Sequence, residues 1–176
     1  MKRIALCLAA FAAFSAPALA QDMTATANVM DLEGKSLGIL TLETMDGQVH
    51  ITGALTGLPG GDHGIHIHET GTCDAAGKFD SAGGHFNPGS DQHGKDNPEG
   101  PHAGDLQNIT ATAEGGGALV DLMDASVTLG EGEASLFDTD GSAIVVHADP
   151  DDYKSDPSGN SGDRIACGVI EAGAAK

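Results

Sequence analysis

Short runs of alternating apolar and polar residues recur along most of the chain. The runs "TATANV" and "SLGILTLET" show the period of two that is typical of strands with one buried face, and no run keeps the 3.6-residue spacing of a helix. The pattern predicts eight strands, over residues 23–31, 35–45, 48–58, 64–69, 108–114, 118–123, 143–148 and 166–171. Eight short strands with few helical signals predict an all-β fold, namely an eight-stranded antiparallel Greek-key barrel or sandwich.

Two segments interrupt this rhythm. Residues 70–107 and 148–165 are long, polar and rich in Gly, Asp, Asn and Pro, and they carry no strand pattern. Loops of this length in a compact domain are usually functional or disordered. The first loop holds three of the eight histidines, which favours a functional role.

The first twenty residues differ from all that follow. Lys2 and Arg3 precede an apolar run that ends in "SAPALA" at Ala20, which is the order of a secretory signal peptide with a small-residue cleavage site. We therefore expect a signal peptide over residues 1–20 and a single domain over residues 21–176. The signal is bacterial in style and favours a periplasmic location, with secretion to the outside as the alternative. No later stretch has the roughly 20 apolar residues of a membrane-spanning helix.

The composition is strongly acidic. Asp and Glu number 26 against 8 Lys and Arg, and the formal net charge is -18. Such a surface repels nucleic acid and anionic lipid, and a chain with one Tyr and no Trp offers few stacking platforms. The sequence thus predicts no nucleic-acid partner and no membrane partner.

The cysteine count predicts one disulfide. Of three cysteines, Cys7 lies inside the predicted signal peptide, so Cys73 and Cys167 remain in the exported chain. Thiols oxidise in exported proteins, and the simplest arrangement is a single Cys73–Cys167 bond with no free thiol.

Paired histidines mark one predicted strand. The stretch "HGIHIHET" places His66 and His68 two residues apart, so both imidazoles project from the same face. That pair either lies on the solvent face of an amphipathic strand or converges on one ion. His147 ends another predicted strand, and three imidazoles from strands without a sulfur ligand favour copper(II) over a softer metal.

A second group of ligands lies in the first long loop. The stretch "GGHFNPGSDQHGKDNPEGPHAGD" contains His85, His93, His102 and Asp105. Three imidazoles and a carboxylate suit tetrahedral zinc, although histidine clusters also occur on surfaces without a metal.

Five motifs together resemble copper/zinc superoxide dismutase. These are "GIHIHE", "AGGHFNP", "HAGDLQN", "VVHADPDD" and "GDRIACGVI", in the family's order and with similar spacing, and the resemblance extends from about residue 23 to residue 171. It implies dismutation of superoxide to dioxygen and hydrogen peroxide by a copper ion that is alternately reduced and reoxidised. It assigns copper to His66, His68, His85 and His147, and zinc to His85, His93, His102 and Asp105. His85 would then bridge the two metals.

The resemblance also implies roles for residues around the metals. Asp151 matches the aspartate that orients one copper ligand and one zinc ligand, with Asp152 as the alternative if the loop is shifted by one residue. Arg164 matches the arginine beside the copper that guides the superoxide anion. His63 matches a structural position, and His50 belongs to no motif and is expected at the surface.

Some features stay open at this level. The segment from Asp151 to Arg164 is shorter than the steering loop of many family members and holds only Lys154 as a mobile cation, which puts steering by lysine in doubt. A homodimer is compatible with the resemblance. A periplasmic copper/zinc storage or delivery module would use the same ligands without turnover, whereas a zinc hydrolase would need an open zinc position.

Overall fold

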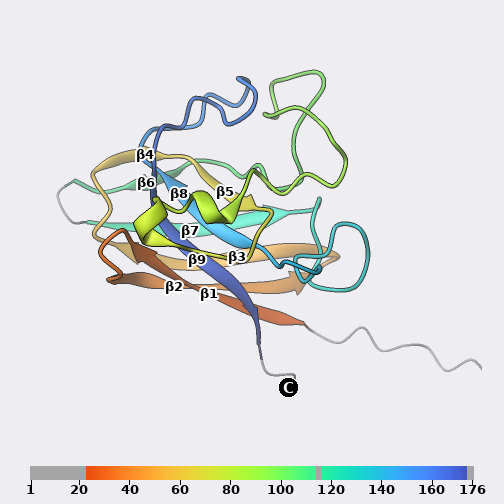
Figure 1. The fold of residues 1–176 in the computed structure, drawn as a ribbon, viewed down its shortest axis with the longest axis horizontal. Coiled ribbons are helices and arrows are strands. Elements are labelled where there is room, and N and C mark those ends of the chain that lie inside the picture. Colours follow the sequence, from red (N-terminus) through yellow and green to blue (C-terminus); the bar gives the residue numbers. More distant parts are fainter. Residues whose placement is uncertain (1–22, 114–115, 174–176) are drawn as a thin grey trace, which may run out of the picture.

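The fold is a single antiparallel β-sheet that curves into a nearly closed barrel (Figure 1). A computed structural model describes residues 23–113 and 116–173, and it contains nine strands within those residues. The strands are β1 (Thr24–Asp31), β2 (Ser36–Met45), β3 (Gln48–Thr56), β4 (Gly61–His63), β5 (Ile65–His68), β6 (Ile109–Ala111), β7 (Gly117–Asp124), β8 (Ala143–His147) and β9 (Arg164–Ala172). Their order in the sheet is β4-β6-β7-β3-β2-β1-β9-β8-β5.

The two ends of this sheet are consecutive in the chain. Strands β4 and β5 occupy opposite ends of the strand order, and Gly64 alone separates them. The Gly64 N–H donates to the Asp149 carbonyl at 2.9 Å, and the Gly64 carbonyl accepts from the His147 N–H at 2.8 Å. A Cβ atom at Gly64 would lie 2.9 Å from the Cβ of Ser161, so only glycine fits this close approach. We call this junction of β4, Gly64 and β5 the barrel seam.

The alternation in the sequence explains the core. In β2, Leu40 and Leu42 are fully buried while Ile39 and Glu43 are exposed, as expected for a strand with one face turned inward. The interior is filled by such residues from most of the strands, including Val29, Leu40, Ile51, Leu55, Ile67, Val120 and Ile144. Burial of this apolar surface stabilises the barrel.

The predicted all-β class and antiparallel barrel are confirmed, but the prediction of eight strands is one short. Each of the eight predicted strands is found, with ends that differ by a few residues. The missed strand is β4, which pairs with β6. It is only three residues long, "GDH", and shows no apolar alternation from which it could be predicted.

The connections differ from the prediction in one further respect. Within the described residues, the loop over residues 70–107 contains two single-turn 3-10 helices, Ala75–Gly77 and Asp80–Ala82, and no strand. A third long connection, over residues 125–142, joins β7 to β8, and the prediction left it as a gap between two strands without identifying it as a long loop. The predicted signal peptide over residues 1–20 lies outside the described residues. In the part of the chain that is described, no helix is long and apolar enough to span a bilayer.

The predicted disulfide is present. Cys73 of the first long loop is bonded to Cys167 of β9, with their Cα atoms 5.7 Å apart. Cys167 is fully buried in a small apolar cluster with Phe79 and Ala82 of the same loop. The bond therefore fastens the loop over residues 70–107 to the barrel wall.

Candidate metal centres

Strand β5 projects its two histidines away from the core. Ile65 and Ile67 point into the barrel, and His66 and His68 alternate with them on the opposite face, although all four are buried. The cover is the first long loop, which returns antiparallel beside β5. The Ile67 N–H donates to the Gly104 carbonyl at 2.9 Å, and the Ile67 carbonyl accepts from the Phe86 N–H at 2.8 Å. These bonds bring His85 and Asp105, which flank Phe86 and Gly104, next to the strand.

Four histidines form the first cluster. His66, His68, His85 and His147 each offer one ring nitrogen within 4.8 Å of the others, and all four are buried. Among the described residues, six buried side-chain polar atoms have no hydrogen-bond partner, and four of them are His66 Nδ1, His68 Nε2, His85 Nε2 and His147 Nε2. Buried polar groups are rarely left without a partner, so these four atoms fit the ligand set of a cation.

The opposite nitrogens of these rings are occupied. His66 Nε2 lies 2.7 Å from Asp151 Oδ2, His68 Nδ1 lies 3.0 Å from the Gly83 carbonyl, and His147 Nδ1 lies 3.3 Å from the Gly162 carbonyl. Such acceptors fix the ring orientation and leave the other nitrogen deprotonated, as a metal ligand requires.

The second cluster shares His85 with the first. The Nδ1 atoms of His85, His93 and His102 lie 2.8, 3.0 and 3.2 Å from Asp105 Oδ1. Asp105 Oδ2 is held separately by the N–H groups of Gly94 and His102, at 2.8 and 3.0 Å. Oδ1 and three nitrogens therefore converge on one point, with the donor set that zinc prefers.

Burial keeps three histidines of the first cluster neutral. Removal from water lowers the pKa of His68 well below its usual value, that of His85 to about 4 and that of His147 to about 3, and the neighbouring imidazoles act in the same direction. These rings are uncharged at neutral pH, which is the form that binds a metal.

The carboxylates reverse this effect at His93. Burial alone would lower the pKa of His93, but hydrogen bonds to Asp105 and Asp151 outweigh it and raise the pKa to about 9. The pKa values of Asp105 and Asp151 lie well below their usual range. Hydrogen bonds to His85 and then His93 outweigh burial at Asp105, and hydrogen bonds to His66 and then His93 outweigh it at Asp151. In the metal-free protein His93 is therefore a buried cation between two carboxylates.

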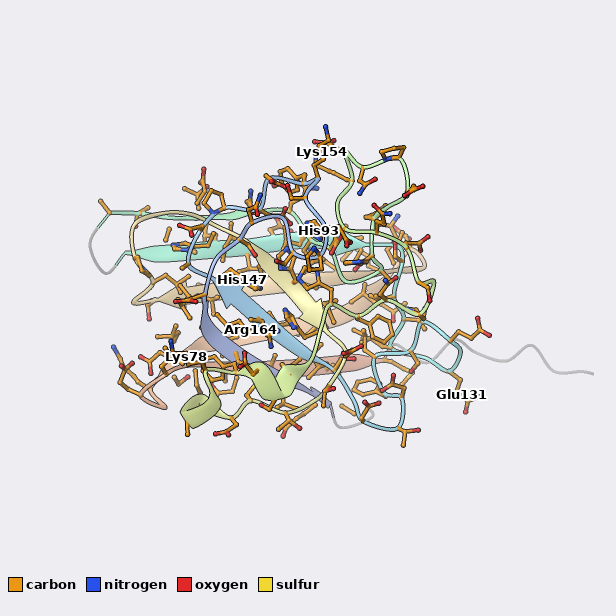
Figure 2. The ribbon with its side chains drawn as sticks, turned by 45° about the horizontal axis from the view of Figure 1, so that its top comes forward. Lys78, His93, Glu131, His147, Lys154 and Arg164 are labelled. Atoms are coloured by element: carbon orange, nitrogen blue, oxygen red, sulfur yellow. A yellow bond between two sulfur atoms is a disulfide. The ribbon has the colours of Figure 1, made fainter. Side chains whose placement is uncertain are left out.

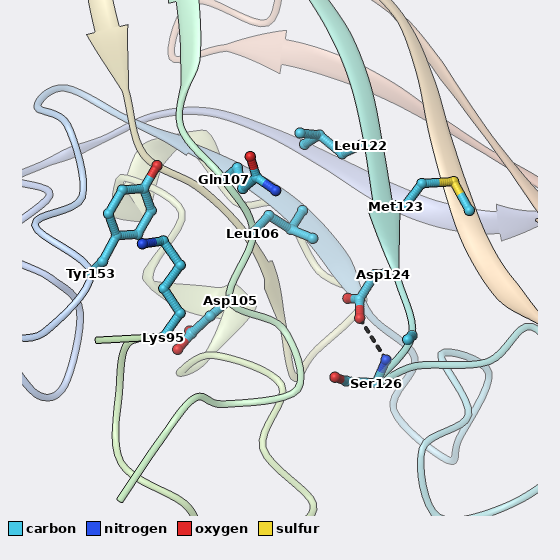
Figure 3. Close-up of a pocket in the computed structure, with 10 residues that line it drawn as sticks. Lys95, Asp105, Leu106, Gln107, Leu122, Met123, Asp124, Ser126 and Tyr153 are labelled. Atoms are coloured by element: carbon cyan, nitrogen blue, oxygen red, sulfur yellow. Dashed lines mark hydrogen bonds between the residues drawn. The ribbon is translucent and has the colours of Figure 1, made fainter. Parts of the chain in front are cut away.

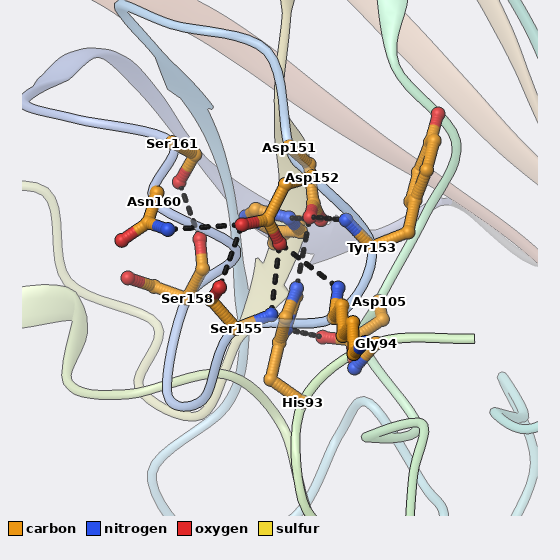
Figure 4. A network of polar contacts seen from close by, with 12 residues as sticks. His93, Gly94, Asp105, Asp151, Asp152, Tyr153, Ser155, Ser158, Asn160 and Ser161 are labelled. Atoms are coloured by element: carbon orange, nitrogen blue, oxygen red, sulfur yellow. Dashed lines mark hydrogen bonds and ion pairs between the residues drawn. The ribbon is translucent and has the colours of Figure 1, made fainter. Parts of the chain in front are cut away.

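Asp151 connects the two clusters (Figure 4). Its Oδ2 lies 2.7 Å from His66 Nε2, and its Oδ1 lies 3.0 Å from His93 Nε2. Asp152 faces solvent and instead accepts from the N–H groups of Lys154 and Ser155. The aspartate that contacts both clusters is thus Asp151, and the loop is not shifted by one residue.

Arg164 lies at the mouth of the first cluster, in a pocket of about 570 Å³ that also includes His68, His85 and His147. Its Nη1 donates to the Phe79 carbonyl and its Nη2 to the Gly83 carbonyl, both at 2.7 Å. The Gly83 carbonyl therefore contacts both the Arg164 guanidinium and the His68 ring. No sequence motif reveals this link, because it is made by a backbone atom. Figure 2 shows Arg164 near His147, with Lys154 at the outer rim of the molecule.

The remaining histidines lie outside both clusters. His63 is buried, and its ring nitrogens lie 2.8 Å from the His147 carbonyl and 2.8 Å from the Pro59 carbonyl, in agreement with a structural role. His50 lies on the outer face of β3, with Nε2 2.7 Å from Asp121 Oδ1.

Comparisons with known proteins agree with this geometry. The family model described as copper/zinc superoxide dismutase (SODC) matches residues 36–170. A copper-zinc superoxide dismutase 2 of Aquifex aeolicus is 45% identical, over 97% of this chain and 99% of that protein. The copper-zinc superoxide dismutase of Caulobacter vibrioides is 44% identical, over 84% and 86% of the two chains.

Solved structures show the same fold. The crystal structure of a SOD-like protein from Bacillus subtilis superposes with a TM-score of 0.74 at 40% identity, and the match covers 82% of this chain and 96% of that one. Because the family model spans most of the chain and relatives match nearly its full length, the chain belongs to the copper/zinc superoxide dismutase family.

Proposed function

We propose that this protein dismutates superoxide to dioxygen and hydrogen peroxide. Copper would be held by His66, His68, His85 and His147, and zinc by His85, His93, His102 and Asp105. The observation that carries the proposal is the set of four unpartnered buried nitrogens beside a second cluster that shares His85. When bound, copper supplies one-electron chemistry, taking an electron from one superoxide and giving an electron to the next. The zinc set is closed with four protein ligands, which suits a structural role rather than hydrolysis.

The protein residues orient the ligands, hold the proton and admit the anion. His85 directs Nδ1 to the zinc set and Nε2 to the copper set, so Nε2 is the atom at which a proton can be held and passed to reduced oxygen. Arg164 presents a cation at the mouth of the pocket, whose lining also includes the carboxylate of Glu69 and the neutral residues Asn87, Ser90 and Ser158. Local positive potential at this mouth can outweigh the acidic surface at short range.

Metal analysis tests the ligand assignment. We expect about one copper and one zinc per chain in the loaded protein, and a copper electron-resonance spectrum that changes when zinc is removed, since His85 serves both metals. A protein that binds copper with no dependence of the spectrum on zinc would contradict the assignment. Superoxide decay measured with and without copper separates an enzyme from a storage module with the same ligands.

Substitution of Arg164 tests the guidance of the substrate. We expect rates in the order Arg, Lys, Ser, Glu, with Arg164→Ser slower by about tenfold, equivalent to about 1.4 kcal/mol in the barrier. Lysine keeps the charge but cannot reach both backbone carbonyls with a planar fork, and glutamate adds repulsion. Pulse radiolysis at low salt measures these rates. Lys154→Ser at the rim is the control and should change the rate less than about twofold, whereas equal rates across the Arg164 series at full metal occupancy would exclude guidance by Arg164.

Zinc binding to the metal-free protein should depend on pH through His93. Because its pKa is raised to about 9, His93 carries a proton at pH 7 that zinc must displace. We expect release of about one proton per zinc at pH 7, and an apparent zinc affinity that rises about tenfold per pH unit until the pH passes the pKa of His93. Calorimetry in two buffers of different ionisation enthalpy measures the proton. A binding enthalpy that is the same in both buffers would contradict this charge state.

We further infer that the protein is exported to a periplasm. The supporting observations are the signal-like sequence of residues 1–20, the Cys73–Cys167 bond and the bacterial relatives. All residues proposed for the two metals come from one chain, so a homodimer would carry a complete site in each copy.

A further inference from the structure

Tyr153 has a backbone conformation that is unusual for an aromatic residue. Its φ is 62°, in the left-handed region where glycine and asparagine are the common residues. A bulky residue remains there only when the surrounding contacts hold it, and such positions often lie beside functional sites. Tyr153 follows Asp151 by two residues, on the loop that carries the contact between the two metal clusters.

Contacts from the first long loop hold Tyr153 in place. Its carbonyl accepts from the Asp96 N–H at 2.9 Å, and the Lys95 Nζ lies 4.2 Å from the centre of its ring. A Cβ atom at Gly94 would lie 2.2 Å from the Tyr153 carbonyl oxygen, so the two loops touch closely. Figure 3 shows Lys95 beside the Tyr153 ring, at a pocket of about 210 Å³ that lies next to Asp105.

The Tyr153 hydroxyl reaches a third segment, just before β6. It accepts a hydrogen bond from the Asn108 N–H at 2.8 Å. The Asn108 side chain in turn holds the backbone of Asp151 from both sides, because its Nδ2 donates to the Asp151 carbonyl at 3.0 Å and its Oδ1 accepts from the Asp151 N–H at 2.8 Å. The Tyr153 hydroxyl therefore holds the backbone of Asn108, and the side chain of Asn108 holds the backbone of Asp151.

Tyr153 also contacts the Asp151 carboxylate directly. The Tyr153 N–H donates to Asp151 Oδ1 at 2.6 Å, which is the oxygen that lies 3.0 Å from His93 Nε2 (Figure 4). Both the backbone and the side chain of Tyr153 thus act on the same aspartate.

We propose that Tyr153 is a positioning residue for both metals. Through Asn108 it sets the place of Asp151, and through Asp151 it sets the orientation of His66 and His93. The inference rests on the ligand assignment proposed above. On this proposal the Tyr153 hydroxyl helps to orient the metal ligands, which packing of the ring alone would not do.

The hydroxyl can be removed without loss of the ring. In Tyr153→Phe the Asn108 N–H loses its acceptor, while the contact of the ring with Lys95 stays. Outer contacts of metal ligands typically change metal affinity by about 10- to 100-fold, and Tyr153 is one contact further out. Water from the adjoining pocket can also replace part of the lost bond. We therefore expect zinc affinity to fall by about three- to tenfold, with a shift in the copper electron-resonance parameters of the loaded protein.

Two further variants make the experiment specific. Asn108→Asp replaces the Nδ2 donor by an oxygen that faces the Asp151 carbonyl, and it should cause a larger change of the same kind. Ser155→Ala removes a hydroxyl from the same loop that contacts only Asp152. It should leave zinc affinity and the copper spectrum as in the wild type. Zinc affinity is measured by competition with a chromophoric chelator.

The outcomes separate this inference from the ligand assignment. If the wild type shows no zinc-dependent copper spectrum, the assignment itself is wrong and the inference falls with it. If the wild type does show that spectrum and Tyr153→Phe matches it in both zinc affinity and copper parameters, Tyr153 has no positioning role. If Tyr153→Phe had a lower melting temperature but unchanged zinc affinity and copper parameters, Tyr153 would contribute only to packing. This result would also overturn the inference.

Discussion

Replacing His85 with alanine is expected to weaken zinc binding and alter the copper spectrum in a single step. One ring offers Nδ1 to the zinc cluster and Nε2 to the copper cluster, so its removal takes one ligand from each metal. Three ligands would remain at each site, and the proton position at Nε2 would be lost. We expect the dismutation rate to fall by about a hundredfold, equivalent to about 2.7 kcal/mol in the barrier. Zinc competition, electron resonance and pulse radiolysis on the same preparation measure the three effects.

The control for His85 is another histidine of the same barrel. His50 contacts only Asp121 on the outer face, so His50→Ala should keep both metal signatures and the rate. A His85→Ala protein in which only one metal's signature changed would show that the ring serves that metal alone. This result would end the claim of a shared ligand.

Loss of the disulfide is the second large effect that we expect. Cys73 and Cys167 are 94 residues apart in sequence, and on the chain-entropy model a loop of this length contributes about 4–5 kcal/mol, of which real bonds deliver a part. We expect Cys73→Ala to lower the free energy of unfolding by about 2–4 kcal/mol in the fully metallated protein. Activity should fall as well, because the Phe79 and Gly83 carbonyls that hold Arg164 belong to the loop that the bond fastens. Urea unfolding and superoxide decay on the same samples measure both.

A hydroxyl in the same loop provides the matched control. Ser81 donates to the Thr72 carbonyl and accepts from the Asp74 N–H, so Ser81→Ala removes local hydrogen bonds and leaves the disulfide intact. Its effect should be about 1 kcal/mol. If Cys73→Ala melted and turned over like the wild type, the bond would have neither the stabilising role nor the orienting role.

The sequence predicts most of the fold because burial is periodic in the strands. Leu40 and Leu42 alternate with exposed residues, and this pattern survives into the structure. Strand β4 could not be predicted, since it owes its existence to pairing with β6 rather than to any pattern of its own. The connection over residues 125–142 lies in the gap between two predicted strands, but it was not identified as a third long loop. Its apolar residues, such as Leu129 and Leu136, pack into the core.

The candidate site was predictable wherever chemistry is carried by side chains. Histidines, Asp105 and Arg164 stand in recognisable motifs, and the structure brings them together. The contacts that orient them are largely made by backbone atoms, such as the Gly83 carbonyl and the Asn108 N–H, and every residue type has a carbonyl and every one except proline has an N–H. Their positions follow from tertiary structure, so no motif reports them.

The barrel seam has a consequence for the lifetime of the protein before it receives its metals. Copper and zinc would bridge β5, β8 and the two long loops, which meet where the sheet closes, whereas β1, β2 and β3 are joined by regular ladders. Local opening concentrates where regular pairing is sparse, and proteases cut such openings. A ligand present at a thousand times its dissociation constant stabilises the closed form by about 4.1 kcal/mol. Metal supply would thus govern how long each chain survives proteolysis, as well as whether it is active.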